Sequence, residues 1–324
     1  MLAHQRRERS IGLAPSGSVK DAAMNNIVQL HAQGASARIV PQAGARVSAL
    51  QLVSPSGRTV QVLHPYPEDF FDPIRWAKGG IYPLMPYSNR IADATLRVNG
   101  ETVALAPHPD AAPHTLHGNA HAQAWQVAEV DAGSAVLTLD SVACNAWPWR
   151  YAGRMHLELT ACELAIHIEV RNTSAKVMPA GIGLHPYFCH HPGARIRYQA
   201  STVWPPTADF LAGPPRKPRS DEIYAVARSL PAGGLTHYVG GWDGTAWFDL
   251  PQGARLQLSA DPVLRHLVVH RPDSMAYLCL EPVSHVADGF NMAAHGIAHT
   301  GTRLLGPGAS LAGTLRLRVL EDHE

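Results

Sequence analysis

Long apolar segments are missing from this 324-residue sequence. No run approaches the ~20 residues that a membrane-spanning helix needs, and the N-terminal M-L-A-H-Q-R-R-E-R-S lacks the apolar core of a secretory signal. A surplus of one charge sign is missing too, because 27 Lys and Arg face 26 Asp and Glu, giving a net charge of +1. Nucleic acids and membrane surfaces are therefore not expected partners, and a cytoplasmic location is expected.

Cysteine is scarce, and the familiar cofactor motifs are absent. The four cysteines stand far apart with no C-x-x-C spacing, which argues against a zinc knuckle or a redox pair. Three of them lie in or beside apolar runs and are expected to be buried free thiols rather than disulfides. No Gly-rich phosphate loop and no G-x-S-x-G elbow occurs. The sequence therefore predicts chemistry that needs no cofactor.

Short alternating segments fill the chain instead. The clearest is T-L-R-V-N-G-E-T-V-A-L at 95–105, where apolar residues alternate on both sides of Asn99-Gly100, as in a β-hairpin. Similar pairs occupy 125–140, 154–171 and 247–260. No long window shows a helical stripe, and no repeat of fixed period is present. The pattern predicts an all-β fold, a large antiparallel sandwich or barrel.

This pattern also divides the chain. Residues 1–25 are polar and unpatterned and are expected to be a disordered tail, with Met24 as an alternative first residue. Residues 26–324 are expected to form a single domain. Three long connections, 64–94, 106–124 and 201–221, interrupt the strands. Loops of this length in a compact β domain are usually functional.

One apolar run ends on a carboxylate. The segment A-Y-L-C-L has the length and composition of a buried strand, and Glu281 and Pro282 follow it directly. Because proline cannot donate to a ladder, Glu281 is expected at a strand end. Desolvation on one side would raise its basicity there and suit it to proton abstraction. The alternative is a salt-bridged glutamate at a sheet edge.

Three further motifs place polar side chains where a ligand could reach them. His185 lies in G-I-G-L-H-P-Y-F, His117 in T-L-H-G-N, and Arg90 in Y-S-N-R-I. The arginine fork suits a pair of hydroxyls or a carboxylate. The alternatives are packed or surface histidines and an arginine that satisfies loop carbonyls. Nearby aromatic residues could stack on a sugar ring or simply pack the core: Tyr82, Tyr87, Tyr187 and Trp242.

A metal site is the competing interpretation of the same side chains. His114, His117, His185 and Glu281 would make a zinc or iron set. On an extended chain, however, H-x-x-H places its two rings on opposite faces, because strand side chains alternate. A ligand spacing without structural context is weak evidence for a metal site, so acid–base chemistry without a metal is favoured.

Four motifs occur together in one order: G-G-I-Y-P-L-M-P-Y-S-N-R-I, H-T-L-H-G, G-I-G-L-H-P-Y-F and C-L-E-P-V-S-H-V-A-D-G-F-N. Together they resemble the aldose 1-epimerase (galactose mutarotase) family, from about residue 27 to the C-terminus. The fold of that family is a large antiparallel β-sandwich of about this length, which agrees with the all-β prediction. The expected partner is a small sugar, and the expected assembly is a monomer or homodimer.

The resemblance also implies roles by position. Glu281 matches the family's catalytic base and His185 its catalytic acid. His117 and Arg90 match its sugar-binding and ring-oxygen-side contacts, with Asn89 in support. The resemblance thus implies an isomerase that opens and recloses an aldose ring by acid–base catalysis.

One position departs from the family. Where the family usually has an aspartate that holds a sugar hydroxyl, this chain has Thr236 in L-T-H-Y-V-G-G-W-D-G, so the resemblance does not fix the preferred sugar. His237 or Asp243 could compensate. A hexose-6-phosphate mutarotase is a rival function, with a loop that could reach a phosphate through Arg216, Lys217 and Arg219. A non-catalytic sugar-binding β-sandwich is the rival from a different class.

Overall fold

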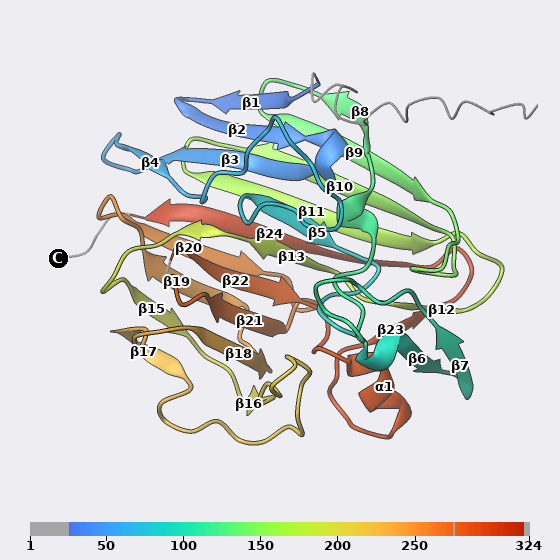
Figure 1. The fold of residues 1–324 in the computed structure, drawn as a ribbon. Helices are drawn as coiled ribbons and strands as arrows, with labels where there is room; N and C mark the ends of the chain where they lie inside the picture. The colour runs from blue at the N-terminus through green and yellow to red at the C-terminus, as the bar shows by residue number, and fades with distance from the viewer. Residues whose placement is uncertain (1–25, 275, 321–324) are drawn as a thin grey trace, which may run out of the picture.

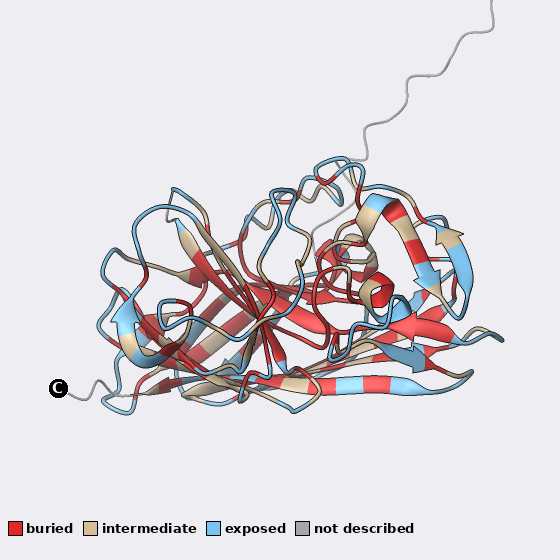
Figure 2. Cartoon of the chain, turned by 90° about the horizontal axis from the view of Figure 1, so that it is seen from below, coloured by how far each residue is buried: buried red, intermediate tan, exposed pale blue. Residues whose placement is uncertain are grey.

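The structure is a computed structural model that describes residues 26–274 and 276–320. Two large antiparallel sheets dominate it (Figure 1). Buried residues concentrate on the strands through the middle of the molecule, and exposed residues on the loops and outer strands (Figure 2). The predicted tail at 1–25 lies outside the described residues. Among the described helices, none is long and apolar enough to cross a membrane.

The larger sheet has eleven strands. Its main path, from edge to edge, is β1 (Val28–Ala32), β2 (Ala35–Val40), β3 (Arg46–Val53), β5 (Ile81–Leu84), β13 (Gly183–Pro186), β22 (Tyr277–Val283), β21 (His266–Arg271), β18 (Leu235–Gly240) and β16 (Thr202–Val203). Two strands leave this path: β4 (Thr59–Gln61) pairs with β3, and β14 (Phe188–Cys189) pairs with β22. The middle of the sheet therefore joins segments from every part of the sequence.

The second sheet has nine strands and contains the longest ones. Its order is β17 (Tyr224–Ser229), β15 (Arg195–Tyr198), β19 (Thr245–Asp249), β20 (Arg255–Ala260), β24 (Ser310–Leu320), β11 (Glu163–Asn172), β10 (Tyr151–Leu159), β9 (Ser134–Ser141) and β8 (Gln126–Val130). Burial alternates along β24 and β10 with a period of two residues, as expected for strands with one face on the core. The predicted all-β antiparallel sandwich is confirmed.

Two small sheets and a short helix complete the fold. The predicted hairpin is confirmed as β6 (Thr95–Val98) and β7 (Glu101–Ala104), and both turn residues, Asn99 and Gly100, have positive φ, as a type I′ turn requires. The other small sheet pairs β12 (Met178–Ala180) with β23 (Arg303–Leu305). The helix α1 (Gly289–Ala294) has only six residues and shows no periodic signal in the sequence.

Two expectations about the larger sheet are wrong in detail. Residues 64–94 and 201–221 are not pure connections, because the first segment contains β5, whose four residues are all buried, and the second contains β16. A strand covered on both faces shows no alternation, so its pattern is absent from the sequence. Glu281 is not at a strand end either, since β22 continues through Pro282 to Val283. Here β13 meets β22 only at the Gly183–Val283 pair, so this proline lies beside a gap in the ladder.

All four cysteines are free, which includes the three expected to be free thiols, but they are not equally buried. Only Cys279 on β22 is buried, Cys144 is exposed, and Cys162 and Cys189 are intermediate. The prediction of free thiols is therefore confirmed, while their burial is confirmed only for Cys279.

Candidate active site

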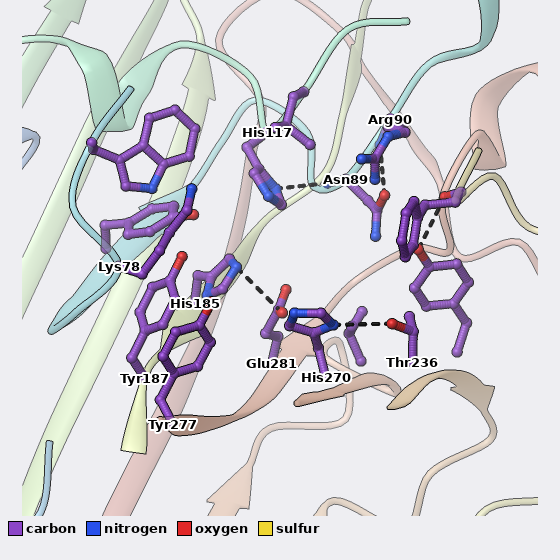
Figure 3. Close-up of a pocket in the computed structure, with 16 residues that line it drawn as sticks. Lys78, Asn89, Arg90, His117, His185, Tyr187, Thr236, His270, Tyr277 and Glu281 are labelled. Atoms are coloured by element: carbon purple, nitrogen blue, oxygen red, sulfur yellow. Dashed lines mark hydrogen bonds and ion pairs between the residues drawn. The ribbon is translucent and has the colours of Figure 1, made fainter. Parts of the chain in front are cut away.

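A pocket of about 200 Å³ opens over the central strands of the larger sheet (Figure 3). Sites for drug-sized ligands measure about 300–1,000 Å³, so this pocket suits a smaller molecule. The three long connections all reach it: the first provides Lys78, Asn89 and Arg90, the second His117, and the third Phe210. The five side chains singled out in the sequence all line this pocket: Glu281, His185, Arg90, His117 and Asn89.

Glu281 and His185 form a close buried pair on the pocket wall. They come from the neighbouring strands β22 and β13, and His185 Nε2 lies 3.3 Å from Glu281 Oε1. The residues are only 3% and 6% exposed, respectively. Burial raises the pKa of Glu281 to about 8, an effect that Arg90 opposes. Burial also lowers the pKa of His185 well below its ordinary value, and nearby imidazoles and cations add to the effect.

Aromatic stacking orients the His185 ring. The imidazole stacks on Tyr82 at 4.8 Å and on Tyr187 at 4.5 Å between ring centroids. Its Nδ1 is buried and has no hydrogen-bond partner among the described residues, so packing fixes the ring where a hydrogen bond does not. Gly183 allows β13 to approach β22, because a Cβ there would lie 2.6 Å from a methyl of Val283. This explains the glycine in the G-I-G-L-H motif.

Two hydrogen bonds join Asn89 and His117. The His117 amide donates to the Asn89 carbonyl at 2.8 Å, and the Asn89 amide donates to His117 Nδ1 at 3.1 Å. Because Nδ1 accepts and burial lowers the pKa of this histidine well below 6.5, the ring is neutral with its proton on Nε2. Gly118 makes the turn possible, since its φ is +67° and a Cβ would lie 2.4 Å from the Met85 carbonyl oxygen. His117 therefore offers an N–H donor to a ligand.

The loop that contains Arg90 is docked on the segment that follows β22. His285 Nε2 accepts from the Ser88 amide at 3.1 Å, and the Asp288 amide donates to the Arg90 carbonyl at 2.8 Å. Asp288 Oδ1 also accepts from the Ala92 amide at 2.9 Å. The motifs Y-S-N-R-I and E-P-V-S-H-V-A-D, nearly 200 residues apart, therefore form one structural unit.

The Arg90 side chain faces the third connection. Its guanidinium lies 5.0 Å from the centre of the Phe210 ring, in a cation–π contact. The Phe210 carbonyl accepts a hydrogen bond from Tyr238 at 3.0 Å. Arg90 makes no side-chain ion pair among the described residues, so its donors remain available to a ligand at this end of the pocket.

Thr236 lines the pocket, but neither of the two residues suggested as substitutes for an aspartate does. Thr236 Oγ1 hydrogen-bonds His270 Nδ1 at 3.0 Å, and both residues line the pocket. His237 faces away on the same strand and contacts Tyr198 at 3.3 Å. Asp243 lies in a turn, where it accepts from the Thr245 amide. The suggested compensation by His237 or Asp243 is therefore wrong, and His270 is the polar neighbour of Thr236.

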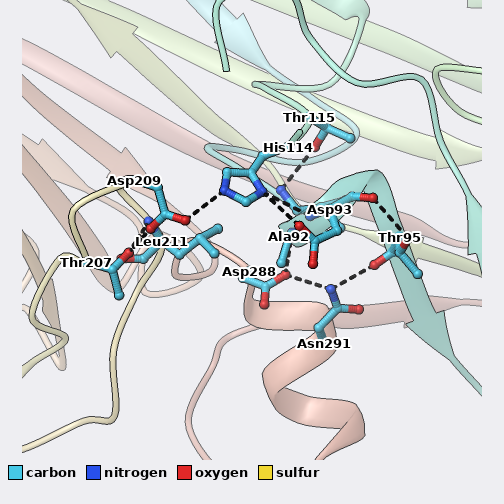
Figure 4. Close-up of polar contacts among 11 residues, drawn as sticks. Ala92, Asp93, Thr95, His114, Thr115, Thr207, Asp209, Leu211, Asp288 and Asn291 are labelled. Atoms are coloured by element: carbon cyan, nitrogen blue, oxygen red, sulfur yellow. Dashed lines mark hydrogen bonds and ion pairs between the residues drawn. The ribbon is translucent and has the colours of Figure 1, made fainter. Parts of the chain in front are cut away.

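The H-x-x-H pair does not converge on a metal. His114 lies outside the pocket, where its Nε2 is 2.9 Å from Asp209 Oδ2 and its Nδ1 accepts from the Asp93 amide at 2.9 Å (Figure 4). A different group, His185, Cys279 and Glu281, places one potential ligand atom from each residue within 4.8 Å of the others. A soft divalent cation fits that donor set, but it would occupy both Glu281 and His185.

The basic loop at 216–219 also lies outside the pocket. Arg216 and Arg219 both contact Glu222, at 2.5 Å and 3.0 Å, and neither lines the pocket. The rival interpretation, in which this loop reaches a phosphate in the pocket, is therefore not supported. Of the four aromatic candidates, Tyr82 and Tyr187 line the pocket, while Tyr87 and Trp242 pack in the core.

Several pocket residues lie outside the motifs described above: Trp76, Lys78, Phe210 and His270. Tyr238 could be predicted from the sequence, because it lies two residues after Thr236 and so on the same face of the strand. Lys78 and Phe210 come from irregular loops, whose path no periodicity records.

Comparisons with known proteins show which family the chain is similar to. The family model for aldose 1-epimerase matches residues 26–318. The uncharacterized protein YphB of Escherichia coli K12 is 28% identical over 247 residues, which cover 74% of this chain and 83% of YphB. The name of that relative gives no function, so this similarity indicates neither an activity nor a substrate.

Solved structures share the fold. A protein of Escherichia coli K12, described as a candidate aldose 1-epimerase, has a TM-score of 0.80 at 24% identity, covering 92% of this chain and 99% of that chain. A galactose 1-epimerase from Lactobacillus acidophilus has a TM-score of 0.72 at 16% identity, with 92% and 99% coverage. The matched family model spans nearly all of the described residues, and the four motifs meet at one pocket. This chain belongs to the aldose 1-epimerase family.

Proposed function

We propose that this protein interconverts the α and β anomers of an aldose, with Glu281 as the base and His185 as the acid. The observation that supports this most strongly is the 3.3 Å separation of His185 Nε2 and Glu281 Oε1 on the pocket wall. In an aldose, the anomeric hydroxyl and the ring oxygen are bonded to the same carbon. Two proton-transfer groups this close together can reach both oxygens of one sugar.

In the proposed reaction, Glu281 removes the proton of the C1 hydroxyl while the His185 imidazolium protonates the ring oxygen. The C1–O5 bond breaks and an aldehyde forms. Rotation about C1–C2 then presents the other face of the carbonyl to the C5 hydroxyl. Reclosure returns a proton from that hydroxyl to His185 and gives the Glu281 proton to O1. Each positioned proton transfer contributes typically ~10²–10⁴-fold to the rate.

The buried pair stores the single proton that this cycle needs. Glutamate with imidazolium and glutamic acid with neutral imidazole contain the same number of protons, and the reaction passes from one arrangement to the other. Burial favours the uncharged arrangement in the free protein. The charged arrangement becomes accessible when sugar hydroxyls and the neighbouring Arg90 support the carboxylate.

The pH dependence of kcat/KM should report on this pair, because activity requires that it hold one proton. Loss of that proton leaves no acid, so kcat/KM should fall as pH rises through about 8, the raised pKa of Glu281. A second proton leaves no base, and because the His185 pKa is lowered, this acid limb should lie well below pH 6.5. Anomer exchange measured by magnetisation-transfer NMR from pH 4 to 10 tests the profile. A sharp loss of activity between pH 6 and 7 would contradict it.

Arg90→Ala is expected to raise KM by about tenfold or more, with a smaller fall in kcat. The guanidinium faces the pocket and can donate to sugar oxygens in both the ground and transition states, so its loss removes uniform binding. Steady-state kinetics by polarimetry separate the two constants. Arg58→Ala removes an exposed arginine from a distant turn and is the matched control. An unchanged KM in Arg90→Ala would exclude the assigned contact.

A further inference from the structure

Lys78 is a pocket cation without a counter-charge. It lies in the first long connection, and its ammonium is 4.6 Å from the centre of the Trp76 ring. Among the described residues it has no hydrogen bond and no ion pair. The nearest acidic influence on its pKa is Asp110, whose carboxylate lies 3.4 Å from Arg75. The side chain is therefore held at the pocket by an aromatic ring, with its donors free.

The charges around the pocket are unbalanced. Arg46 is fully buried behind Tyr82, with its guanidinium 4.3 Å from the centre of that ring, and its Nε and Nη2 have no hydrogen-bond partner among the described residues. Arg90 adds a third cation at the other end of the pocket. Glu281 is the one carboxylate among the residues that line the pocket, and Thr236 stands where the resemblance implies an aspartate. A ligand with a negative charge would restore the balance.

Lys78 and Arg90 lie at opposite ends of the pocket (Figure 3). Lys78 lies beside Tyr187 and His185, on the opposite side of the pocket from Arg90 and Thr236 (Figure 3). The positive charges of Arg46 and Lys78 both lower the pKa of the His185 imidazole. The excess positive charge therefore faces the acid rather than the base.

We propose that the substrate is an aldose with an anionic substituent, a carboxylate or a phosphate, and that Lys78 binds that substituent on the His185 side of the pocket. This rests on the proposed anomer interconversion. His185 is assigned to the ring oxygen, so the substituent on the adjacent ring carbon, C5, is the one nearest Lys78. An aldose oxidised or phosphorylated at C6 has its charge there, whereas a neutral hexose leaves Lys78 without a counter-ion.

The anion would also help the chemistry. A negative group against Lys78 offsets the positive potential at His185 and so favours its protonated form, which ring opening requires. Substrates of this class would activate the acid on binding, and neutral sugars would not. Lys78 is then a specificity-determining residue as well as a binding one.

The test compares wild type, Lys78→Gln and Lys78→Arg on D-glucose, D-galactose, D-glucuronic acid, D-galacturonic acid and D-glucose 6-phosphate. Magnetisation-transfer NMR measures anomer exchange at equilibrium, so no pure anomer is needed. Wild type should prefer at least one acidic sugar over its neutral counterpart by about ten- to hundredfold in kcat/KM. Lys78→Gln should remove that preference, and Lys78→Arg should retain most of it. Lys217→Gln, which removes an exposed lysine from outside the pocket, is the control.

The different sugars distinguish failure of the Lys78 subsite from failure of the proposed anomer interconversion. Comparison of the uronic acids with glucose 6-phosphate shows which anion fits. Turnover of neutral sugars at equal or better kcat/KM than every acidic sugar would overturn the Lys78 subsite and leave the proposed function standing. If no sugar is turned over, calorimetric titration with the acidic sugars decides the subsite. Binding that Lys78→Gln abolishes would support it, and no binding by wild type would overturn it.

Discussion

Glu281→Gln is expected to lower kcat by about 10²–10⁴-fold, since the amide cannot accept the proton of the C1 hydroxyl. The change is close to isosteric, and the pocket should still bind sugar, so KM should change much less than kcat. Steady-state polarimetry on wild type and variant measures both. Glu158→Gln, on the exposed face of β10, is the control and should behave as wild type. Normal turnover by Glu281→Gln would remove this residue from the mechanism.

The same variant should be more stable than wild type at alkaline pH. The pKa of Glu281 is raised from 4.5 to about 8 in the folded protein, so its stabilising effect is complete below pH 4.5 and is lost as pH rises through 8. Glutamine is uncharged throughout and escapes this loss. The expected gain at pH 8 is about 1–3 kcal/mol, or a few degrees in Tm, and it should shrink towards pH 5. A Tm that falls at pH 8 would show that lost activity reflects misfolding.

His185→Asn is expected to lower kcat by a similar ~10²–10⁴-fold, because no acid then protonates the ring oxygen. Asparagine keeps a polar group in the pocket but cannot shuttle a proton, and the stacking between Tyr82 and Tyr187 is lost. The pH profile distinguishes a chemical role from a structural one. In the variant, residual activity should rise with pH as Glu281 ionises and should show no alkaline limb near pH 8.

His31→Asn is the control for this substitution, since that imidazole is exposed on the edge strand β1. A His185→Asn enzyme that kept the wild-type alkaline limb with unchanged kcat would show that another group provides the proton.

Regular alternation predicted most of the fold. The 95–105 hairpin and the pairs β8–β9, β10–β11 and β19–β20 all appear where period-two patterns flank turn residues. The strand β5 was missed because it is covered on both faces, and such a strand has no polar side to alternate. The continuation of β22 past Pro282 was missed because the gap in the neighbouring strand is a tertiary feature.

The site was predictable where short motifs combine a polar residue with glycine or proline. His117 before Gly118 and His185 after Gly183 occur where a side chain on the glycine would collide with a neighbouring strand or loop. Lys78, His270 and Phe210 could not be found this way. Their position at the pocket depends on long-range strand order and on loop paths, which local sequence does not record.

The most direct measurement follows the optical rotation of freshly dissolved α-D-glucose and α-D-galactose, and of glucuronic acid released as a single anomer, with and without the protein. The wild type is expected to accelerate the approach to anomeric equilibrium for at least one of these sugars, without changing the final rotation. A decay of rotation no faster than the buffer control for every sugar, in a folded protein that binds them, would contradict it and identify a sugar-binding protein.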